Sequence, residues 1–412
     1  MLPRPDLLSD RSPAGLEVFQ LTTEPDVPGS HVYMEAQIFA PDSRRLVLHR
    51  SAHPHGSDPK DPEHAYLLCD LDAQGELSAL TTELGATAPS ISPDGQYLYY
   101  FIDETTMWGG RLTLKRVRLD GSGRETLAVL DGAIPGEALH PSRPYPLSTI
   151  SSDGRRIAIS AFLGDGRVEY PMQPEWGLLV FDVEPASVRL ILRGESWCNV
   201  HPQYCRSLDR EASRDLLIQE NHGNITGPDG RVTRLVGGAG ADLHVIRDDG
   251  THLRSLPFGR DGNEFCQGHQ CWRGQGGRVI TSTVTRSPAS ARLIEGTPVE
   301  GFSHSGSALS GGRRMDLTRS HPQPDFHHFA TDRTGARFIT DSGPKDARGA
   351  IFVADLPADE DGELENLRFL LSPRSSWRKD SHIHPFLSPD GTAGFFNSDE
   401  SGVLQAYMVR GF

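Results

Sequence analysis

The chain has 412 residues, of which 36% are hydrophobic and 23% charged, with 43 glycines and 30 prolines. This composition is typical of a folded, turn-rich protein and excludes intrinsic disorder and collagen. The net charge of −14 and the lack of any Lys/Arg run argue against nucleic acid as a partner. No segment reaches the ~18 apolar residues of a membrane span, and the N-terminus has no secretion signal. We therefore expect a cytoplasmic protein with no membrane partner.

One short pattern recurs along the chain: an apolar strand, a Pro-Asp-Gly-like turn and a second strand. Its spacing is somewhat above the ~40 to 50 residues of propeller blades, which predicts four-stranded blades with long loops. In chain order the seven copies are AQIFAPDSRRLVLHR from Ala36, PSISPDGQYLYYF from Pro89, STISSDGRRIAIS from Ser148, HPQYCRSLDREASRDLLIQ from His201, HQCWRGQGGRVITS from His269, HFATDRTGARFIT from His328 and HPFLSPDGTAGFF from His384.

The last blade lacks one strand at the C-terminal end, because the residues after Asp390 suffice only for the turn and two strands. The segment VFQLTTEP at Val18 closely resembles LSALTTE at Leu77, an outer strand of another unit. We therefore predict an all-β, seven-bladed propeller whose ring is closed by this N-terminal strand. Residues 1–412 are expected to form a single domain.

Histidines open four consecutive copies of the repeat. His201, His269, His328 and His384 stand at equivalent positions, and His382 precedes His384 by two residues. The first strand of each propeller blade lines the central channel, so these side chains are expected to converge on the axis. A lone strand histidine is more often a core or surface residue, but a set in register favours a metal or acid/base site. His-x-His with a third imidazole from a neighbouring blade makes a three-nitrogen site with positions open to substrate.

Other features are less specific. The polar insert with His53, His55 and His64 is expected to be a surface loop. The five cysteines are odd in number and form no C-x-x-C pair, so we expect neither a disulfide framework nor a thiolate zinc site. No G-x-S-x-G motif occurs, which leaves a serine hydrolase without support.

Four segments carry a resemblance to a known family. They are HPQY at His201 followed by ENHG at Glu220, FCQGHQCW with His269, HFATDRTGARFITD at His328, and SHIHPFLSPDGTAGFFNSDESG at Ser381. Together they resemble the oligogalacturonate lyases, which are cytoplasmic seven-bladed propellers that use manganese. The resemblance covers nearly the whole chain, although the first three blades match only as generic propeller.

The resemblance implies a divalent metal, Mn²⁺ first, held by His269, His382 and His384. The family's fourth ligand is a glutamine, and Lys379 stands at its position here. A protonated ammonium cannot bind a metal, so a water, Asp380 or a substrate carboxylate would have to complete the coordination.

The resemblance also implies a base and groups that bind the substrate. His222 corresponds to the family histidine near the scissile bond, and His201 is its substitute. The family's arginine has no match without gaps: Arg193 is nearest, and Arg206 is the alternative. The groups expected to bind substrate carboxylates are Arg193 or Arg206, Lys379 and His328.

Such a site fits β-elimination from a 4-linked uronate. The C5 hydrogen lies next to a carboxylate, and its removal is prohibitively difficult unless a cation neutralises that carboxylate. A histidine suits the base role because its pKa near ~6.5 keeps it largely neutral at physiological pH. The sequence thus predicts a lyase that cleaves short oligogalacturonides, which are pectin fragments, to 4,5-unsaturated products.

Two alternatives stay open. One is a lyase for another uronate oligosaccharide, such as a fragment of ulvan, alginate or rhamnogalacturonan. The other is a non-catalytic propeller that binds sugars or proteins, although such a module has no need of axial histidines. The sequence does not indicate an oligomeric state.

Overall fold

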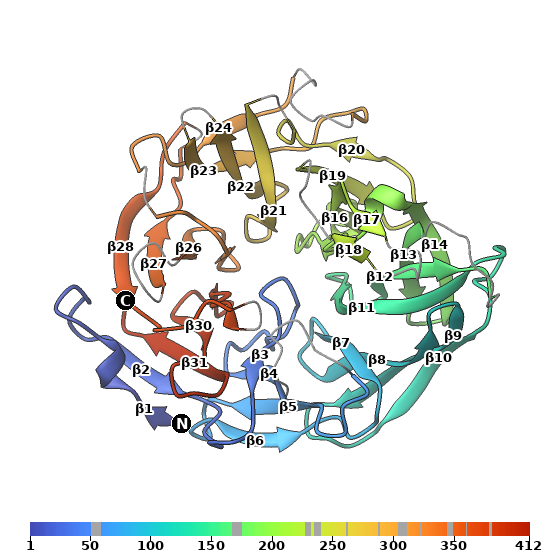
Figure 1. The fold of residues 1–412 in the computed structure, drawn as a ribbon, viewed down its shortest axis with the longest axis horizontal. Helices are drawn as coiled ribbons and strands as arrows, with labels where there is room; N and C mark the ends of the chain where they lie inside the picture. The colour runs from blue at the N-terminus through green and yellow to red at the C-terminus, as the bar shows by residue number, and fades with distance from the viewer. Residues whose placement is uncertain are drawn as a thin grey trace.

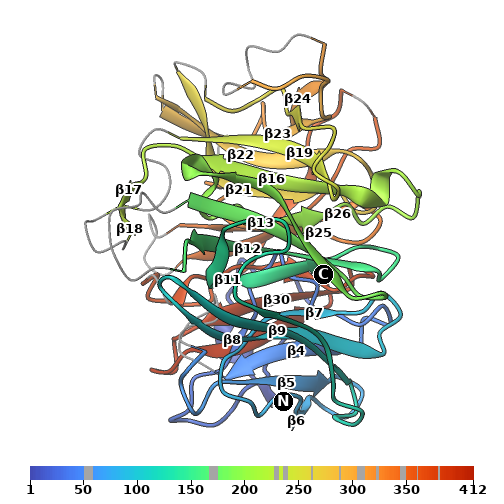
Figure 2. The same cartoon turned by 90° about the vertical axis from the view of Figure 1, so that its right-hand side faces the viewer.

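The structure is a computed structural model that describes residues 1–50, 59–166, 175–226, 232–234, 240–260, 263–286, 289–303, 311–321, 324–343, 349–359, 361–378 and 381–412. These residues fold into antiparallel sheets arranged around a central axis (Figure 1). Figure 2 shows this ring from the side, with the paired strands β17 (Ile225–Thr226) and β18 (Val232–Arg234) projecting from one face. Within the described ranges, no helix combines the length and apolar character that a membrane crossing requires.

The first three blades each contain four strands paired in chain order. Blade one has β3 (Ser30–His31), β4 (Arg45–Arg50), β5 (Ala65–Asp70) and β6 (Glu76–Ala79). Blade two has β7 (Ala86–Ile91), β8 (Tyr97–Thr106), β9 (Gly109–Arg118) and β10 (Glu125–Asp131). Blade three has β11 (His140–Ile150), β12 (Arg156–Gly164), β13 (Glu175–Asp182) and β14 (Ser187–Gly194).

The next three blades follow the same order with one insertion. Blade four has β15 (Gln203–Tyr204), β16 (Asp215–Asn221), β19 (Ala241–Arg247) and β20 (Arg254–Ser255), with the hairpin β17 (Ile225–Thr226) and β18 (Val232–Arg234) inserted. Blade five has β21 (Glu264–Trp272), β22 (Val279–Arg286), β23 (Ala289–Gly296) and β24 (Arg314–Asp316). Blade six has β25 (Phe329–Thr331), β26 (Arg337–Ser342), β27 (Ala350–Asp355) and β28 (Glu365–Leu371). Short 3₁₀ helices lie at η1 (Pro5–Leu7), η2 (Glu195–Trp197) and η3 (Ala212–Arg214).

The seventh blade joins the two ends of the chain. It contains β29 (Phe386–Leu387), β30 (Ala393–Ser398), β31 (Gln405–Arg410), β2 (Glu17–Gln20) and β1 (Leu2–Pro3). Strand β2 pairs antiparallel with β31, with Glu17 opposite Arg410. The predicted propeller and its closing N-terminal strand are therefore confirmed. The fifth strand, β1, was not predicted.

The Pro-Asp-Gly turns are held by their own side chains. In blade seven, Asp390 accepts the hydroxyl of Ser388 at 2.6 Å and the backbone N–H of Thr392 at 3.1 Å. Gly391 has a φ of +71°, a left-handed conformation that glycine adopts without steric cost. Aspartate and glycine are therefore favoured by the local geometry, which explains why the repeat is visible in the sequence.

Apolar side chains fill the spaces between neighbouring blades. For example, the rings of Phe101 and Phe181 in blades two and three meet edge to face at 5.1 Å. The five cysteines are free thiols, and all except the half-buried Cys271 are buried. Because each blade packs on two neighbours, the ring holds the inner strands in place around the axis.

The inner strands give the channel two different ends. The histidines predicted to face the axis lie at or just before the inner strands of blades four to seven, and the tight turns follow those strands. We call the first end the histidine mouth and the second end the turn mouth. In blade four, His201 and Arg206 lie at opposite ends of β15, roughly 15 Å apart at the rise of an extended strand.

Candidate functional site

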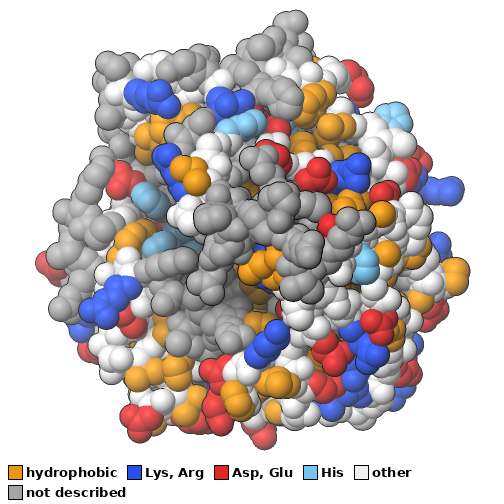
Figure 3. Space-filling model, turned by 45° about the vertical axis from the view of Figure 1, so that its right-hand side comes forward, with side chains coloured by type: hydrophobic (Ala, Val, Ile, Leu, Met, Phe, Trp, Pro, Cys, Tyr) orange, Lys and Arg blue, Asp and Glu red, His pale blue; other side chains and the backbone are white. Residues whose placement is uncertain are grey.

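Three imidazoles meet at the histidine mouth. His328, His382 and His384 each offer one ligand nitrogen, and these atoms all lie within 4.8 Å of one another. The ring centroids of His328 and His384 are 4.3 Å apart, and His382 lies 5.4 Å from each of them. We call this group the imidazole triad. On the face drawn in Figure 3, neighbouring patches of histidine side chain lie in a hollow.

Two further imidazoles surround the triad. The ring of His269, on β21, lies 4.5 Å from that of His328, and the ring of His327 lies 5.9 Å from it. A bulge in β21 includes Gly268 at a φ of +89°, where an added Cβ would lie 2.9 Å from the amide of Gln219. This bulge re-aims the strand next to His269. His269 is thus an immediate neighbour of the triad.

The backbone at the histidine mouth is strained. His384 has a φ of +45°, His201 of +48° and Trp377 of +57°, all in the left-handed region. Such a conformation costs on the order of 1–3 kcal/mol for a residue other than glycine. Trp377 stacks on His382 at 5.3 Å.

Asp341, on β26, orients His328. Its carboxylate lies 2.9 Å from Nδ1 of His328 and accepts that residue's backbone N–H at 2.8 Å. Burial raises the pKa of Asp341 to about 7, although the backbone N–H groups of His328 and His384 act against this shift. This contact occupies Nδ1 of His328. Nε2 of His328 is therefore the nitrogen that faces the rest of the triad.

The protonation of these histidines fits a metal site. Burial lowers the pKa of His269 and of His328 well below the usual value, and neighbouring histidines act in the same direction. Both imidazoles are therefore neutral at physiological pH, which is the form that binds a metal. Neutral imidazole nitrogens suit zinc, iron, nickel and copper, and manganese, which prefers oxygen ligands, would need water or a substrate carboxylate to complete its coordination.

His201 lies on the same axis and is linked to the triad through an aromatic ring. Its Nδ1 atom lies 2.6 Å from a carboxylate oxygen of Glu35, and both side chains are buried. The ring of Tyr33 lies 5.5 Å from His201 and 4.8 Å from His384. The ring of Tyr145 lies 5.5 Å from the other side of His201. A histidine and carboxylate pair is therefore placed next to the triad.

His222 belongs to a second group, at the end of β16. Its Nε2 atom lies 3.0 Å from Asp242 and 3.7 Å from Glu220. Arg260 donates to the same Asp242 carboxylate at 2.9 Å. Hydrogen bonds from His244 and Ser196 overcome the effect of burial and lower the pKa of Glu220 to about 2. The His222 ring therefore lies beside two carboxylates.

The two candidate arginines lie away from the triad. Arg193 is on β14, the outermost strand of blade three, where its half-exposed side chain lies 3.8 Å from Glu137 and from Glu175. Arg206 lies at the turn mouth. The structure therefore brings neither arginine to the imidazole triad. Lys379, predicted to stand beside the metal, lies outside the described residues, as does Asp380.

The expected surface loop is only partly within the described residues. His53 and His55 lie outside them. His64 is buried, and its Nε2 atom lies 2.6 Å from the carbonyl oxygen of Ala86. The expectation of exposure is therefore wrong for His64, because β5 begins directly after it and carries it into the interior.

Several residues at the histidine mouth were not predicted. They are Tyr33, Glu35, His327, Asp341 and Trp377. Asp341 ends the segment HFATDRTGARFITD, in which the repeat pattern singles out only His328. Tyr33 and Glu35 precede the first copy of the repeat, and the repeat pattern does not single them out.

Comparisons with known proteins identify relatives only at the level of the fold. No protein-family model and no curated protein matches the sequence. The oligogalacturonate lyase of Vibrio parahaemolyticus has a similar structure, with 17% identity over 97% of this chain and 95% of that chain and a TM-score of 0.68. An oligogalacturonate lyase in complex with manganese has 18% identity, coverage of 96% and 93% and a TM-score of 0.70. A prolyl endopeptidase has 11% identity over 95% of this chain but only 50% of its own, with a TM-score of 0.51.

The expected structural resemblance to oligogalacturonate lyases is therefore confirmed, and it extends over nearly the full length of both chains.

Proposed function

We propose that this protein is a metal-dependent lyase that cleaves uronate oligosaccharides by β-elimination, with oligogalacturonides as the first substrates to test. The observation that carries the proposal is the imidazole triad, which is formed by three histidines that lie just before the inner strands of blades six and seven. The structural likeness to oligogalacturonate lyases, one of them in complex with manganese, supports this substrate class and this metal. A propeller that only binds proteins has no use for converging neutral imidazoles.

His328, His382 and His384 are proposed to hold the metal, with His269 beside them as a further ligand. Asp341 supports the arrangement because it fixes the ring and the backbone of His328. When bound, a divalent cation neutralises the substrate carboxylate and makes the adjacent C–H bond acidic. The sequence expectation assigned His328 to the substrate. The short distances within the triad favour a ligand role instead.

His222 is proposed as the base that removes the C5 proton. Its side chain is 15% exposed, against 6% for His201, so a substrate reaches it more readily. Asp242 orients the ring and stabilises the positive charge that the ring gains with the proton. The C4 oxygen then leaves as the C4–C5 double bond forms. Arg260, bound to Asp242, places a guanidinium beside this histidine.

The test is a search for the unsaturated product. Ultraviolet absorbance of the conjugated double bond is followed on oligogalacturonides and on ulvan, alginate and rhamnogalacturonan fragments, each with and without Mn²⁺. We expect an increase that requires the metal and that is lost in His382→Ala. The exposed histidine variant His252→Ala is the matched control. If absorbance increases only with another uronate, that uronate replaces oligogalacturonide as the proposed substrate. If absorbance increases with none of the substrates while metal is bound, the proposal is overturned.

A further inference from the structure

A cavity of about 360 Å³ opens at the turn mouth and extends along the channel as far as Glu35, the residue whose carboxylate also contacts His201. The exposed turn residues Pro41 and Pro93 lie at its edge, so it is accessible from outside. Phe39 and Phe386, with ring centroids 6.0 Å apart, form part of its wall. A volume of this size is in the range of small-molecule sites. The cavity is therefore large enough for a ligand.

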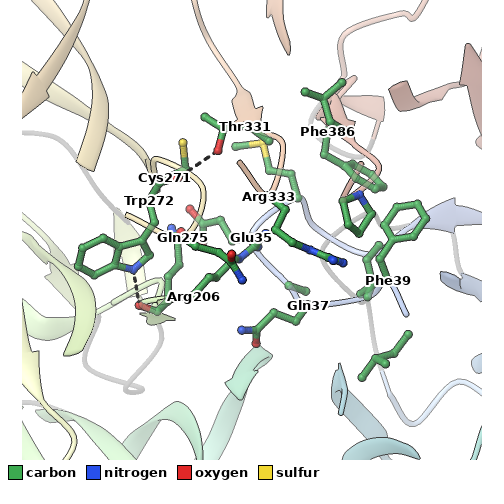
Figure 4. A pocket seen from close by; sticks show the side chains of 18 of the residues that line it. Glu35, Gln37, Phe39, Arg206, Cys271, Trp272, Gln275, Thr331, Arg333 and Phe386 are labelled. Carbon is green, nitrogen blue, oxygen red and sulfur yellow. Dashed lines mark hydrogen bonds between the residues drawn. The ribbon is translucent and has the colours of Figure 1, made fainter. Parts of the chain in front are cut away.

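Two guanidinium groups enter this cavity (Figure 4). Arg206 follows β15 and Arg333 follows β25, so they come from blades four and six. Arg333 donates a hydrogen bond to the carbonyl oxygen of Pro41 at 2.8 Å. The side chain of Arg206 makes no hydrogen bond and no ion pair with any described residue, although it is only partly exposed. Burial lowers the pKa of Arg206, and the charge of Arg333 acts in the same direction.

The positive charge of the two arginines is not balanced by acidic residues in the cavity wall. Among the described residues that line it, Glu35 is the sole acidic one, and its carboxylate is bound by His201. Gln275 also lines the cavity and supplies a neutral amide. A guanidinium removed from water without an anionic partner is destabilising, and an anion placed beside it would relieve this cost. The uncompensated side chain is Arg206.

We propose that the cavity at the turn mouth binds a small organic carboxylate, held between Arg206 and Arg333 with its apolar body against Phe39 and Phe386. Guanidinium groups bind carboxylates through short, charge-assisted hydrogen bonds. The aromatic wall adds a preference for an apolar body over a bare inorganic anion. The sequence analysis expected Arg206 to bind the lyase substrate, but the structure places it at the turn mouth. The site uses none of the residues proposed to hold the metal or to remove the C5 proton, so its test is independent of the proposed activity.

Benzoate is the probe, because it combines a carboxylate with an aromatic body. Its binding is measured by titration calorimetry against benzamide, the uncharged analogue, and against inorganic phosphate. We expect benzoate to bind more tightly than the other two compounds. Arg206→Gln should lower the affinity for benzoate by at least about tenfold, because a charged hydrogen bond is lost. Arg333→Gln should act in the same direction. Arg155→Gln, an exposed arginine in a turn of blade three, is the matched control and should change nothing.

Thermal unfolding gives a second readout. Benzoate should raise the Tm of the parent and of Arg155→Gln but not that of Arg206→Gln, because a ligand stabilises only the protein that binds it. If Arg206→Gln does not fold, Arg333→Gln decides the question. Equal binding of benzoate and benzamide, or no effect of either arginine, would overturn the proposal. Phosphate that binds as tightly as benzoate would also overturn it, because the cavity would then be a site for inorganic anions.

Discussion

The Nδ1 atom of His328 lies 2.9 Å from the carboxylate of Asp341, and the other oxygen of that carboxylate accepts the backbone N–H of His328 at 2.8 Å. One buried acid thus holds both the ring and the main chain of a triad histidine. Carboxylates in this position fix the ring orientation of metal-binding histidines and raise their basicity. Asp341 is therefore central to the candidate metal site, although it offers no ligand atom to the triad.

The first prediction concerns Asp341. In Asp341→Asn the side-chain amide oxygen can still accept the backbone N–H of His328, but the negative charge of the carboxylate is lost. We expect Mn²⁺ affinity to fall by about 10- to 100-fold, the usual effect of losing such a partner. Titration calorimetry measures the affinity, with Asp355→Asn, a half-exposed aspartate on the next strand of the same blade, as control. Affinity equal to that of the parent would show that His328 does not depend on Asp341 for its role.

The second prediction concerns metal loading. His384→Ala removes one of three nitrogens that lie within 4.8 Å of one another, so the purified variant should carry much less divalent metal than the parent. Elemental analysis measures metal per chain, and His252→Ala serves as the reference. Retention of the parental metal content would contradict the assignment of the triad.

The third prediction separates the two candidate bases. His222→Ala should lose activity by about 10²- to 10⁴-fold, the contribution of a positioned base, while its metal content stays unchanged. His201→Ala should lose less, because its side chain is more deeply buried beside Glu35. Steady-state kinetics and elemental analysis are measured on both variants. A near-parental kcat in His222→Ala with a large loss in His201→Ala would transfer the role to His201.

The fourth prediction is a pH dependence of stability that comes from His31. Burial lowers the pKa of His31 to about 3, whereas an unfolded histidine titrates near ~6.5. Between these values the unfolded chain binds a proton that the folded chain does not, so this contribution to stability is full above pH ~6.5 and declines as the pH falls. The slope is about 1.4 kcal/mol per pH unit. The free energy of unfolding is measured by urea denaturation at pH 7, 6 and 5, after bound metal has been removed with a chelator. Its dependence on pH should be shallower in His31→Gln than in the parent.

A slope that His31→Gln leaves unchanged would show that His31 gains no proton on unfolding. The variant is suitable because a glutamine amide can still donate to the carbonyl oxygen of Tyr407, which lies 2.9 Å from the His31 ring.

The fifth prediction concerns ring closure. Removal of residues 1–21 deletes β1 and β2 and leaves β31 as an unpaired edge. We expect a lower Tm and concentration-dependent aggregation, since exposed strand edges pair with other chains. Glu17→Gln is the control, because it removes only an exposed ion pair with Arg410, which contributes about 0–1 kcal/mol. Unchanged melting and solubility of the truncated chain would mean that the ring does not need its fourth strand.

The fold could be predicted from the sequence because its local requirements repeat. Every turn of the type formed by Asp390 and Gly391 needs an acceptor side chain and a left-handed residue, so similar letters return in most blades. The closing strand at Val18 was also visible, because it must match the outer strands elsewhere. That residues 1–412 form one domain stays a prediction.

The site was only partly accessible to the same reasoning. His382 and His384 could be paired from their spacing, because that spacing is local. The short distance between the rings of His328 and His384 depends on how blades six and seven pack against each other. Glu35 could not be linked to His201 at all, since the contact crosses the channel between blades one and four. Arg193 was placed by sequence proximity alone, and the structure puts it on an outer strand.

The pairing of β2 with β31 also governs the order in which the molecule can be completed. Glu17 lies opposite Arg410, so until nearly the whole chain has left the ribosome β2 can pair only with the two-residue strand β1. Synthesis proceeds at about 5–20 residues per second, so blades one to six have many seconds to form before the ring can close. Contacts between such distant residues also form slowly once both strands are present. During that interval the edge of β2 that later pairs with β31 is open to pairing with other chains.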